Sequence, residues 1–227
     1  QMGNDTKSEV CLFVGPRMMY DTSAMALSSN GKLLGGRHSG IEQLKFAMED
    51  IFRAVDLGIQ SILVADEGLL WLIKEAKEKN IIPKSLIVKV SALVSPPNPI
   101  SARIYSDLGG TTLNVPSDLS LIQLATIRQV VDVPIDLYVE SPDDLGGFIR
   151  HYEIPELVRV AAPIYLKFGL RNARGIYPTG NHLETEAIAQ AKERVRRAYL
   201  GLELMNRYYP EAIQSSGESE DLGVPQV

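Results

Sequence analysis

The stretch Ser61–Phe168 decides the fold, because short apolar runs return within it about every 25 residues. The runs are Ser61–Ala65 (SILVA), Leu86–Val90 (LIVKV), Thr111–Val115 (TTLNV), Ile135–Val139 (IDLYV) and Ile164–Phe168 (IYLKF). Helix-like sequence separates them. Strands that alternate with helical patterns indicate parallel βαβ units, whose chemistry lies at the carboxyl ends of the strands.

The flanking sequence adds further predicted elements. Val10–Val14 reads as a first strand, Val158–Ala161 as an additional strand, and a long helix is expected over about 182–209. Shorter helices are expected at Leu69–Lys79, Ser101–Leu108, Asp118–Val131 and Pro142–Tyr152. Six or seven parallel strands predict a (β/α)8 TIM-barrel-like fold that is short or incomplete. An open, doubly wound parallel sheet is the alternative, although no GxGxxG motif or glycine-lysine phosphate loop supports a nucleotide-binding version.

Composition narrows the functional classes. The 227 residues are 45% hydrophobic and carry a formal charge of −5, so neither a general basic field nor nucleic-acid binding is expected. No apolar run approaches the roughly 20 residues that span a bilayer, so no membrane role is expected. Cys11 is the only cysteine, which predicts a cytoplasmic protein without an iron–sulfur cluster.

The domain organisation predicted from the sequence is simple. Residues 1–9 read as a polar leader, residues 10–210 as one domain and residues 211–227 as a flexible acidic tail. The long helix before the tail carries an apolar stripe that either covers the sheet or contacts a second subunit, as in a homo-oligomer or a complex with a partner protein.

The alternation of side chains along each strand predicts a polar face. Asp136, Tyr138 and Glu140 share one face of their strand, while the apolar residues between them take the other. The same reasoning selects Lys89 with Ser91, Asn114, and Lys167. These groups either pair with one another inside a barrel or line a ligand pocket, and their convergence at one end of the strands favours the pocket.

A second set of candidates lies in loops at the same end. Lys167 is followed closely by Arg171 and Asn172, and Arg171 is suited to a substrate carboxylate or phosphate, or to tying its loop to a nearby acid. His38 and His182 are each expected in loops at this face, where they would contact a substrate or a metal.

Two chemistries fit these residues. Lys89 or Lys167 near carboxylates could form a Schiff base, with Tyr138 or Glu140 moving protons, as in a carbon–carbon lyase or aldolase. Alternatively, Asp136 and Glu140 could hold a divalent metal ion, the cofactor expected if there is one, and support hydrolysis. The predicted catalytic residues are therefore Glu140, Asp136, Lys167 and Lys89. The predicted substrate-binding residues are Arg171, Asn172, Asn114, Tyr138, Ser91, His182 and His38.

Three segments, Asp107–Asn114, Tyr138–Gly147 and Lys167–Asn172, together resemble a divergent branch of the U32 peptidase-like TIM-barrel family. The resemblance covers roughly Ile59–Pro210. It implies a barrel with its site at the strand ends and a hydrolase acting on a peptide or other small molecule. Some members of this family instead hydroxylate RNA or quinone precursors with a cysteine-bound iron–sulfur cluster, which Cys11 alone could not hold. The expected function is thus a U32-like hydrolase, with a lyase or a non-catalytic barrel subunit as alternatives.

Overall fold

The structure, a computed structural model, describes residues 2–16, 36–176, 180–216 and 222–226. Its strands form one parallel sheet in the order β1-β2-β3-β4-β5-β6. Their bounds are β1 (Cys11–Val14), β2 (Ser61–Val64), β3 (Ile87–Val90), β4 (Thr112–Asn114), β5 (Ile135–Glu140) and β6 (Ile164–Phe168). The alternation of strands and helices predicted from the sequence is confirmed.

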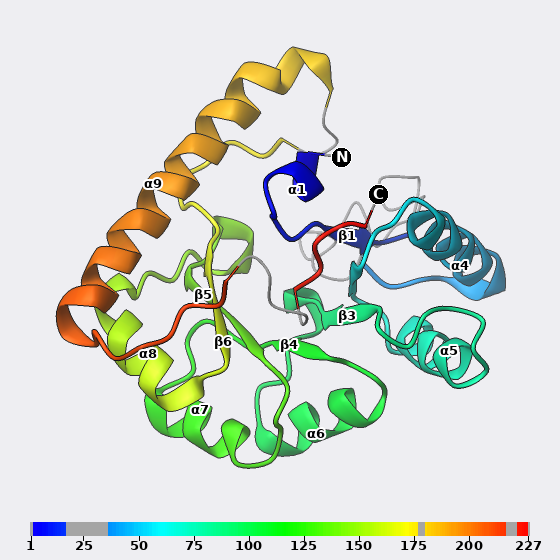
Figure 1. The fold of residues 1–227 in the computed structure, drawn as a ribbon, viewed down its shortest axis with the longest axis horizontal. Coiled ribbons are helices and arrows are strands. Elements are labelled where there is room, and N and C mark those ends of the chain that lie inside the picture. Colours follow the sequence, from blue (N-terminus) through cyan, green and yellow to red (C-terminus); the bar gives the residue numbers. More distant parts are fainter. Residues whose placement is uncertain (1, 17–35, 177–179, 217–221, 227) are drawn as a thin grey trace.

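Helices form an arc around the outside of this sheet (Figure 1). These helices are α4 (Gly40–Asp56), α5 (Glu67–Glu78), α6 (Pro99–Asp107), α7 (Leu121–Arg128), α8 (Ile154–Ala161) and α9 (Glu184–Tyr208). The short helix α1 (Met2–Asp5) lies inside the arc. Single 3-10 turns are η1 (Ala92–Val94), η2 (Asp143–Leu145), η3 (His151–Glu153) and η4 (Asn181–Leu183). Among the described residues, no helix is long and apolar enough to cross a membrane.

The strand order follows the chain and lacks the reversal that defines the classic doubly wound sheets. In the described part of the chain, β1 and β6 each pair with one strand only, so they are the two edges of the sheet. The fold is an α/β arc with helices α4 to α9 on its outer side.

The hydrophobic core lies between the sheet and the helices. Its strand residues are the apolar members of each alternation, including Ile62, Val88, Leu113, Ile135 and Leu137, all fully buried. Side-chain caps lie at the start of α5, α6 and α7, where a capping oxygen satisfies an otherwise unpaired N–H group. The Asp66 carboxylate, for example, accepts the N–H of Leu69 at the start of α5 (2.7 Å).

Two predicted elements are wrong. Val158–Ala161 is the end of helix α8, not a strand, because Ile154, Leu157 and Ala161 form a buried helical stripe. The helix expected over Pro142–Tyr152 is replaced by the turns η2 and η3. Gly146 and Gly147 separate these turns with φ angles of 93° and 61°, which glycine adopts without steric cost.

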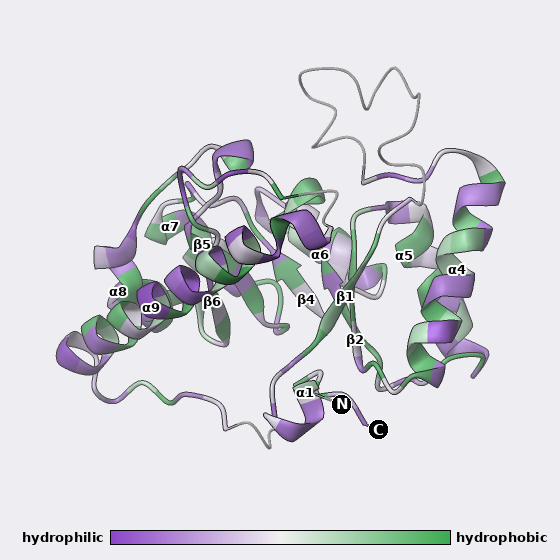
Figure 2. Cartoon of the chain, turned by 90° about the horizontal axis from the view of Figure 1, so that it is seen from above, coloured by the Kyte–Doolittle hydropathy of each residue, from purple (hydrophilic) through white to green (hydrophobic). Residues whose placement is uncertain are grey.

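The two ends of the chain meet near the amino ends of β1 and β2 (Figure 2). The N–H of Val10 donates to the carbonyl of Gly223 (3.0 Å), and the N–H of Gln226 donates to the carbonyl of Gly58 (2.9 Å). Residues 217–221 of the predicted acidic tail lie outside the described residues. The part over 222–226 packs against the sheet, and Gly223 and Pro225 are buried.

Candidate active site

Polar side chains from β3, β4, β5 and β6 meet on the inner face of the sheet, away from the helices. Lys89, Asn114, Asp136, Tyr138 and Lys167 all lie in this group, which we call the inner cluster. The pairing register of the strands brings these side chains together, because Asn114 lies opposite Asp136 and Tyr138 lies opposite Lys167. These five side chains therefore share one face of the sheet, whereas their role in a site stays a prediction.

Lys89 is surrounded by negative charge. Its Nζ lies 3.1 Å from Oε1 of Glu9 and 3.9 Å from Oδ1 of Asp136, and it sits 3.6 Å from the centre of the Tyr165 ring. The side chains of Lys89 and Asp136 are almost fully buried. Lys89 therefore contacts two carboxylates and an aromatic face.

Lys167 has a different environment. Its Nζ donates to Oδ1 of Asn114 and lies 4.2 Å from the centre of the Tyr138 ring. Among the described residues, no carboxylate lies within 4.0 Å of it. The amide nitrogen of Asn114 in turn donates to the carbonyl of Val90 (2.6 Å) and to Oδ2 of Asp136 (3.1 Å). Asn114 therefore links Lys167 to Asp136 and holds the amine of Lys167 in position.

Burial raises the pKa of Asp136 above its usual range, although the ammonium groups of Lys89 and Lys167 oppose that rise. Burial also raises the pKa of the Cys11 thiol, which makes Cys11 a poor nucleophile. Asp136 is therefore a carboxyl group that can hold a proton more readily than an exposed one.

A cavity of about 430 Å³ opens at the carboxyl ends of β4 and β5. Tyr138 connects it to the inner cluster, since its ring lines the cavity and contacts Lys167. The remaining lining residues are Ala92, Ser95, Val115, Pro116, Ser117, Asp118, Asp144, Leu145, Gly146 and Phe148. A cavity of this size suits a small molecule.

Glu140 does not share the environment of Asp136, contrary to the alternation argument. A β-bulge between Tyr138 and Glu140 shifts the register, so that Glu140 lies opposite Phe168. Its carboxylate accepts the backbone N–H of Arg171 (2.6 Å) and the Arg197 guanidinium from α9, and Nε2 of His151 lies 3.2 Å away. Burial alone would raise the pKa of Glu140, but the bonds from Arg171 and Arg197 outweigh it and hold that pKa below the usual range.

Arg171 and Asn172 belong to the loop that follows β6. The Arg171 guanidinium is half-exposed with its Nε 3.6 Å from Oδ1 of Asp143, and the backbone N–H of Asn172 donates to Oδ2 of the same carboxylate (2.7 Å). The structure thus shows Arg171 tying its loop to a neighbouring acid, which was one of its two expected roles.

Three predicted substrate-binding residues lie apart from the inner cluster: His38, His182 and Ser91. The backbone N–H of His38 donates to Asp66 (2.9 Å), and burial lowers the pKa of its imidazole. His182 is exposed in η4. The hydroxyl of Ser91 caps η1 by accepting the N–H of Leu93 (3.2 Å).

Glu9 also belongs to the site, although the sequence analysis placed it in a polar leader. Its carboxylate pairs with Lys89 inside the arc. A signal for it exists: Glu9 shares the alternation of Cys11 and Phe13, so extending the first strand backwards by two residues would have placed it on the inner face.

The sequence predicts that Asp136 and Glu140 could hold a metal ion. The described parts of the chain contain no assembled set of metal ligands. No group of three or more His, Cys, Asp or Glu side chains is placed there to hold an ion. Asp136 and Glu140, the expected ligands, have separate partners: Asp136 contacts Asn114 and Lys89, and Glu140 contacts Arg197 and His151.

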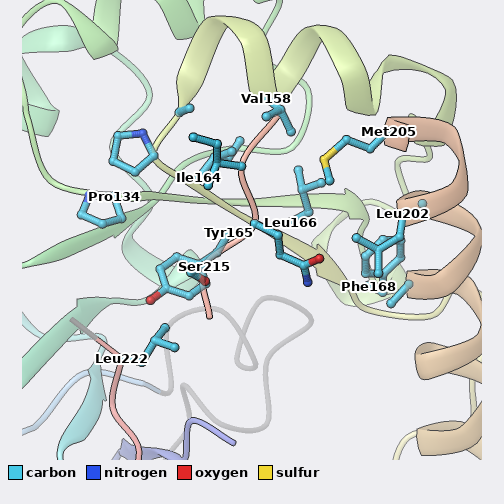
Figure 3. Close-up of a pocket in the computed structure, with 16 residues that line it drawn as sticks. Pro134, Val158, Ile164, Tyr165, Leu166, Phe168, Leu202, Met205, Ser215 and Leu222 are labelled. Carbon is cyan, nitrogen blue, oxygen red and sulfur yellow. The ribbon is translucent and has the colours of Figure 1, made fainter. Parts of the chain in front are cut away.

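A second cavity, of about 370 Å³, lies along the free edge of β6 between α8, α9 and the segment 213–215 (Figure 3). Its walls are mostly apolar, including Val158, Leu166, Phe168 and Leu202. Tyr165 is its one titratable lining residue among those described. Of the inner cluster, Tyr138 lines the other cavity, at the carboxyl ends of β4 and β5.

Comparison with known proteins gives a weak resemblance. No family model matches the chain, and no curated protein matches it. A solved structure of a U32 peptidase is similar over 80% of this chain, with 18% sequence identity and a TM-score of 0.43. The chain spans 62% of the length of that structure.

Proposed function

We propose that the chain is an enzyme with a barrel-type α/β fold, and that Lys167 reacts as an amine with a small carbonyl compound. The reaction would form a Schiff base, the first step of lyase or aldolase chemistry. The substrate would enter through the cavity at the carboxyl ends of β4 and β5, on the side lined by Tyr138.

The observation that carries this proposal is the contrast between the two buried lysines. Lys89 has two carboxylates as partners, those of Glu9 and Asp136. Lys167 directly contacts an amide oxygen and a tyrosine ring, and the charge of Asp136 acts on it without an ion-pair contact. An amine must be uncharged to attack a carbonyl, and uncharged neighbours stabilise an ammonium ion less than carboxylates do.

Each neighbour then has a task in the proposed step. Nζ of Lys167 adds to the carbonyl carbon, and loss of one water molecule gives the imine. Asn114 directs the amine through its carbonyl oxygen, and Asp136 fixes the orientation of Asn114 by accepting from its nitrogen. Lys89 lies beside Asp136, and a positive charge there disfavours a second ammonium ion close by.

Borohydride trapping tests this proposal. The protein is incubated with pyruvate, glyoxylate or glyceraldehyde as probes, reduced with sodium borohydride and weighed by intact mass spectrometry. One reduced adduct per chain is expected with at least one probe, and Lys167→Met should abolish it. Lys45→Met, which removes an exposed lysine of α4, is the matched control and should leave the adduct in place. Equal labelling of the Lys167→Met variant would overturn the proposal.

Hydrolysis is the second candidate, favoured by the raised pKa of Asp136. A buried carboxyl group that keeps its proton can donate it to a leaving group. Under this alternative, Asp136→Asn removes hydrolysis of peptide or ester probes, while Lys167→Met, which leaves that carboxyl group in place, retains it. The pair of variants therefore separates the two chemistries.

A further inference from the structure

The segment that precedes β1 enters the inner cluster. Glu9 lies two residues before Cys11, and its side chain is largely buried, with 16% of its surface exposed. The neighbouring Val10 is anchored by the hydrogen bond from its N–H to the carbonyl of Gly223 (3.0 Å). Both ends of the chain therefore hold the Glu9 carboxylate at the amino end of the inner face.

The charges of the inner cluster balance only when Glu9 is counted. In their ordinary ionised forms, Lys89 and Lys167 contribute two positive charges, and Asp136 and Glu9 contribute two negative charges. Glu9 makes the shorter of the two ion pairs to Lys89, at 3.1 Å against 3.9 Å for Asp136. Among the described residues, the other titratable groups facing this ion pair are the Cys11 thiol from β1 and the Tyr165 ring from β6.

We propose that Glu9 is a positioning residue that holds Lys89 and sets the charge of the cluster around Lys167. The significance of this role for catalysis rests on the proposed Schiff-base function, but the electrostatic role itself does not. With Glu9 in place, Lys89 is shared between two carboxylates, and Asp136 remains available to Asn114. Without Glu9, the buried cluster carries one excess positive charge, which disfavours the ammonium form of each remaining lysine.

Competitive labelling with acetic anhydride measures this effect without any substrate. The folded full chain is labelled across pH 7 to 11, and the modification of the peptide containing Lys167 is quantified by mass spectrometry. In Glu9→Gln, the pH at half-maximal labelling of Lys167 should move down by about 0.5 unit. Glu78→Gln removes the same charge from an exposed position on α5 and should leave the midpoint unchanged.

A second variant tests the opposite sign. Lys89→Met removes a positive charge from the cluster, so the labelling midpoint of Lys167 should move up. An unchanged midpoint in folded Glu9→Gln, checked by circular dichroism, would overturn the role of Glu9. If Glu9→Gln does not fold, the test rests on Lys89→Met. A labelling midpoint of Lys167 that stays unchanged or moves down in Lys89→Met would then overturn the role of Glu9. If the labelling midpoint shifts but borohydride trapping fails, only the Schiff-base function is rejected.

Discussion

At the scale of single residues, Glu140 shows how a buried carboxylate can serve the fold. It joins the end of β5 to α9 through Arg197 and to the loop after β6 through the N–H of Arg171. Because these donors stabilise its charged form, we regard Glu140 as a residue that holds the carboxyl ends of β5 and β6 in position beside the candidate site.

The pH dependence of stability follows from Glu140. Its pKa in the folded protein lies below the ordinary value of 4.5, so it contributes stability that is full above pH 4.5 and is lost as the pH falls further. We expect Glu140→Gln to lower the free energy of unfolding by about 2 kcal/mol at pH 7. The difference from wild type should shrink between pH 5 and pH 3 in urea titrations, and a constant difference would contradict this interpretation.

Asn114 should be the most sensitive uncharged residue of the inner cluster. Asn114→Leu removes the partner of Lys167 and one partner of Asp136, so it should cost about 2 kcal/mol of stability and abolish the trapped adduct. Asn206→Leu, at an exposed position of α9, is the control. Thermal unfolding and adduct mass report the two effects, and a stable variant that still traps the probe would refute the role of Asn114.

At the scale of elements, alternation along the strands predicted the inner cluster but not the position of Glu140. The prediction succeeded for Lys89 and Asp136 because regular strands place every second side chain on one face. It failed at Glu140 because the bulge after Tyr138 depends on pairing with β6, a contact between segments far apart in the sequence. The VRVA run at residues 158–161 was misread because β-branched residues also fit a short buried helix.

The long helix α9 has two kinds of apolar residue. Leu202 packs against the core, whereas Val195 is 56% exposed beside the exposed side chain of Tyr199. Leu202→Glu should therefore lower the free energy of unfolding by about 2 kcal/mol or more, and Val195→Glu should leave it nearly unchanged. Chemical denaturation compares the two variants, and equal losses would show that the exposed stripe is buried in solution.

Equal losses of stability in Leu202→Glu and Val195→Glu would support the proposal that α9 contacts a second subunit. Analytical ultracentrifugation of wild type and Val195→Glu then identifies the assembly: dissociation by Val195→Glu indicates a contact through this stripe. A single sedimentation coefficient, equal for both proteins and typical of a monomer, would leave the exposed stripe without a role in self-association.

At the scale of the whole molecule, the contact between the chain ends closes the amino end of the arc. A Cβ added at Gly223 would lie 2.3 Å from Cβ of Ser61, so Gly223→Ala should displace this segment and cost about 1–3 kcal/mol. A Cβ at Gly175 would meet no atom within 4 Å, so Gly175→Ala is the matched control. Melting temperatures of the two variants test the contact, and equal values would argue against it.

The sequential order of the strands was predictable from the repeat, since each strand follows its helix at nearly constant spacing. The contribution of Glu9 was not predicted, because the alternation of the first strand was not extended back to it and the segment was interpreted as a polar leader. Its position depends on the C-terminal segment, which contacts Val10 from the far end of the chain.

The location of the borohydride-trapped adduct tests the central claim most directly. Protein reduced in the presence of each probe carbonyl compound is digested, and the modified lysine is identified by tandem mass spectrometry. We predict that one lysine, Lys167, carries the adduct, although exposed lysines such as Lys45 and Lys79 are more accessible. Modification spread over the exposed lysines, with Lys167 unmodified, would contradict a lysine-centred site at the carboxyl ends of the strands.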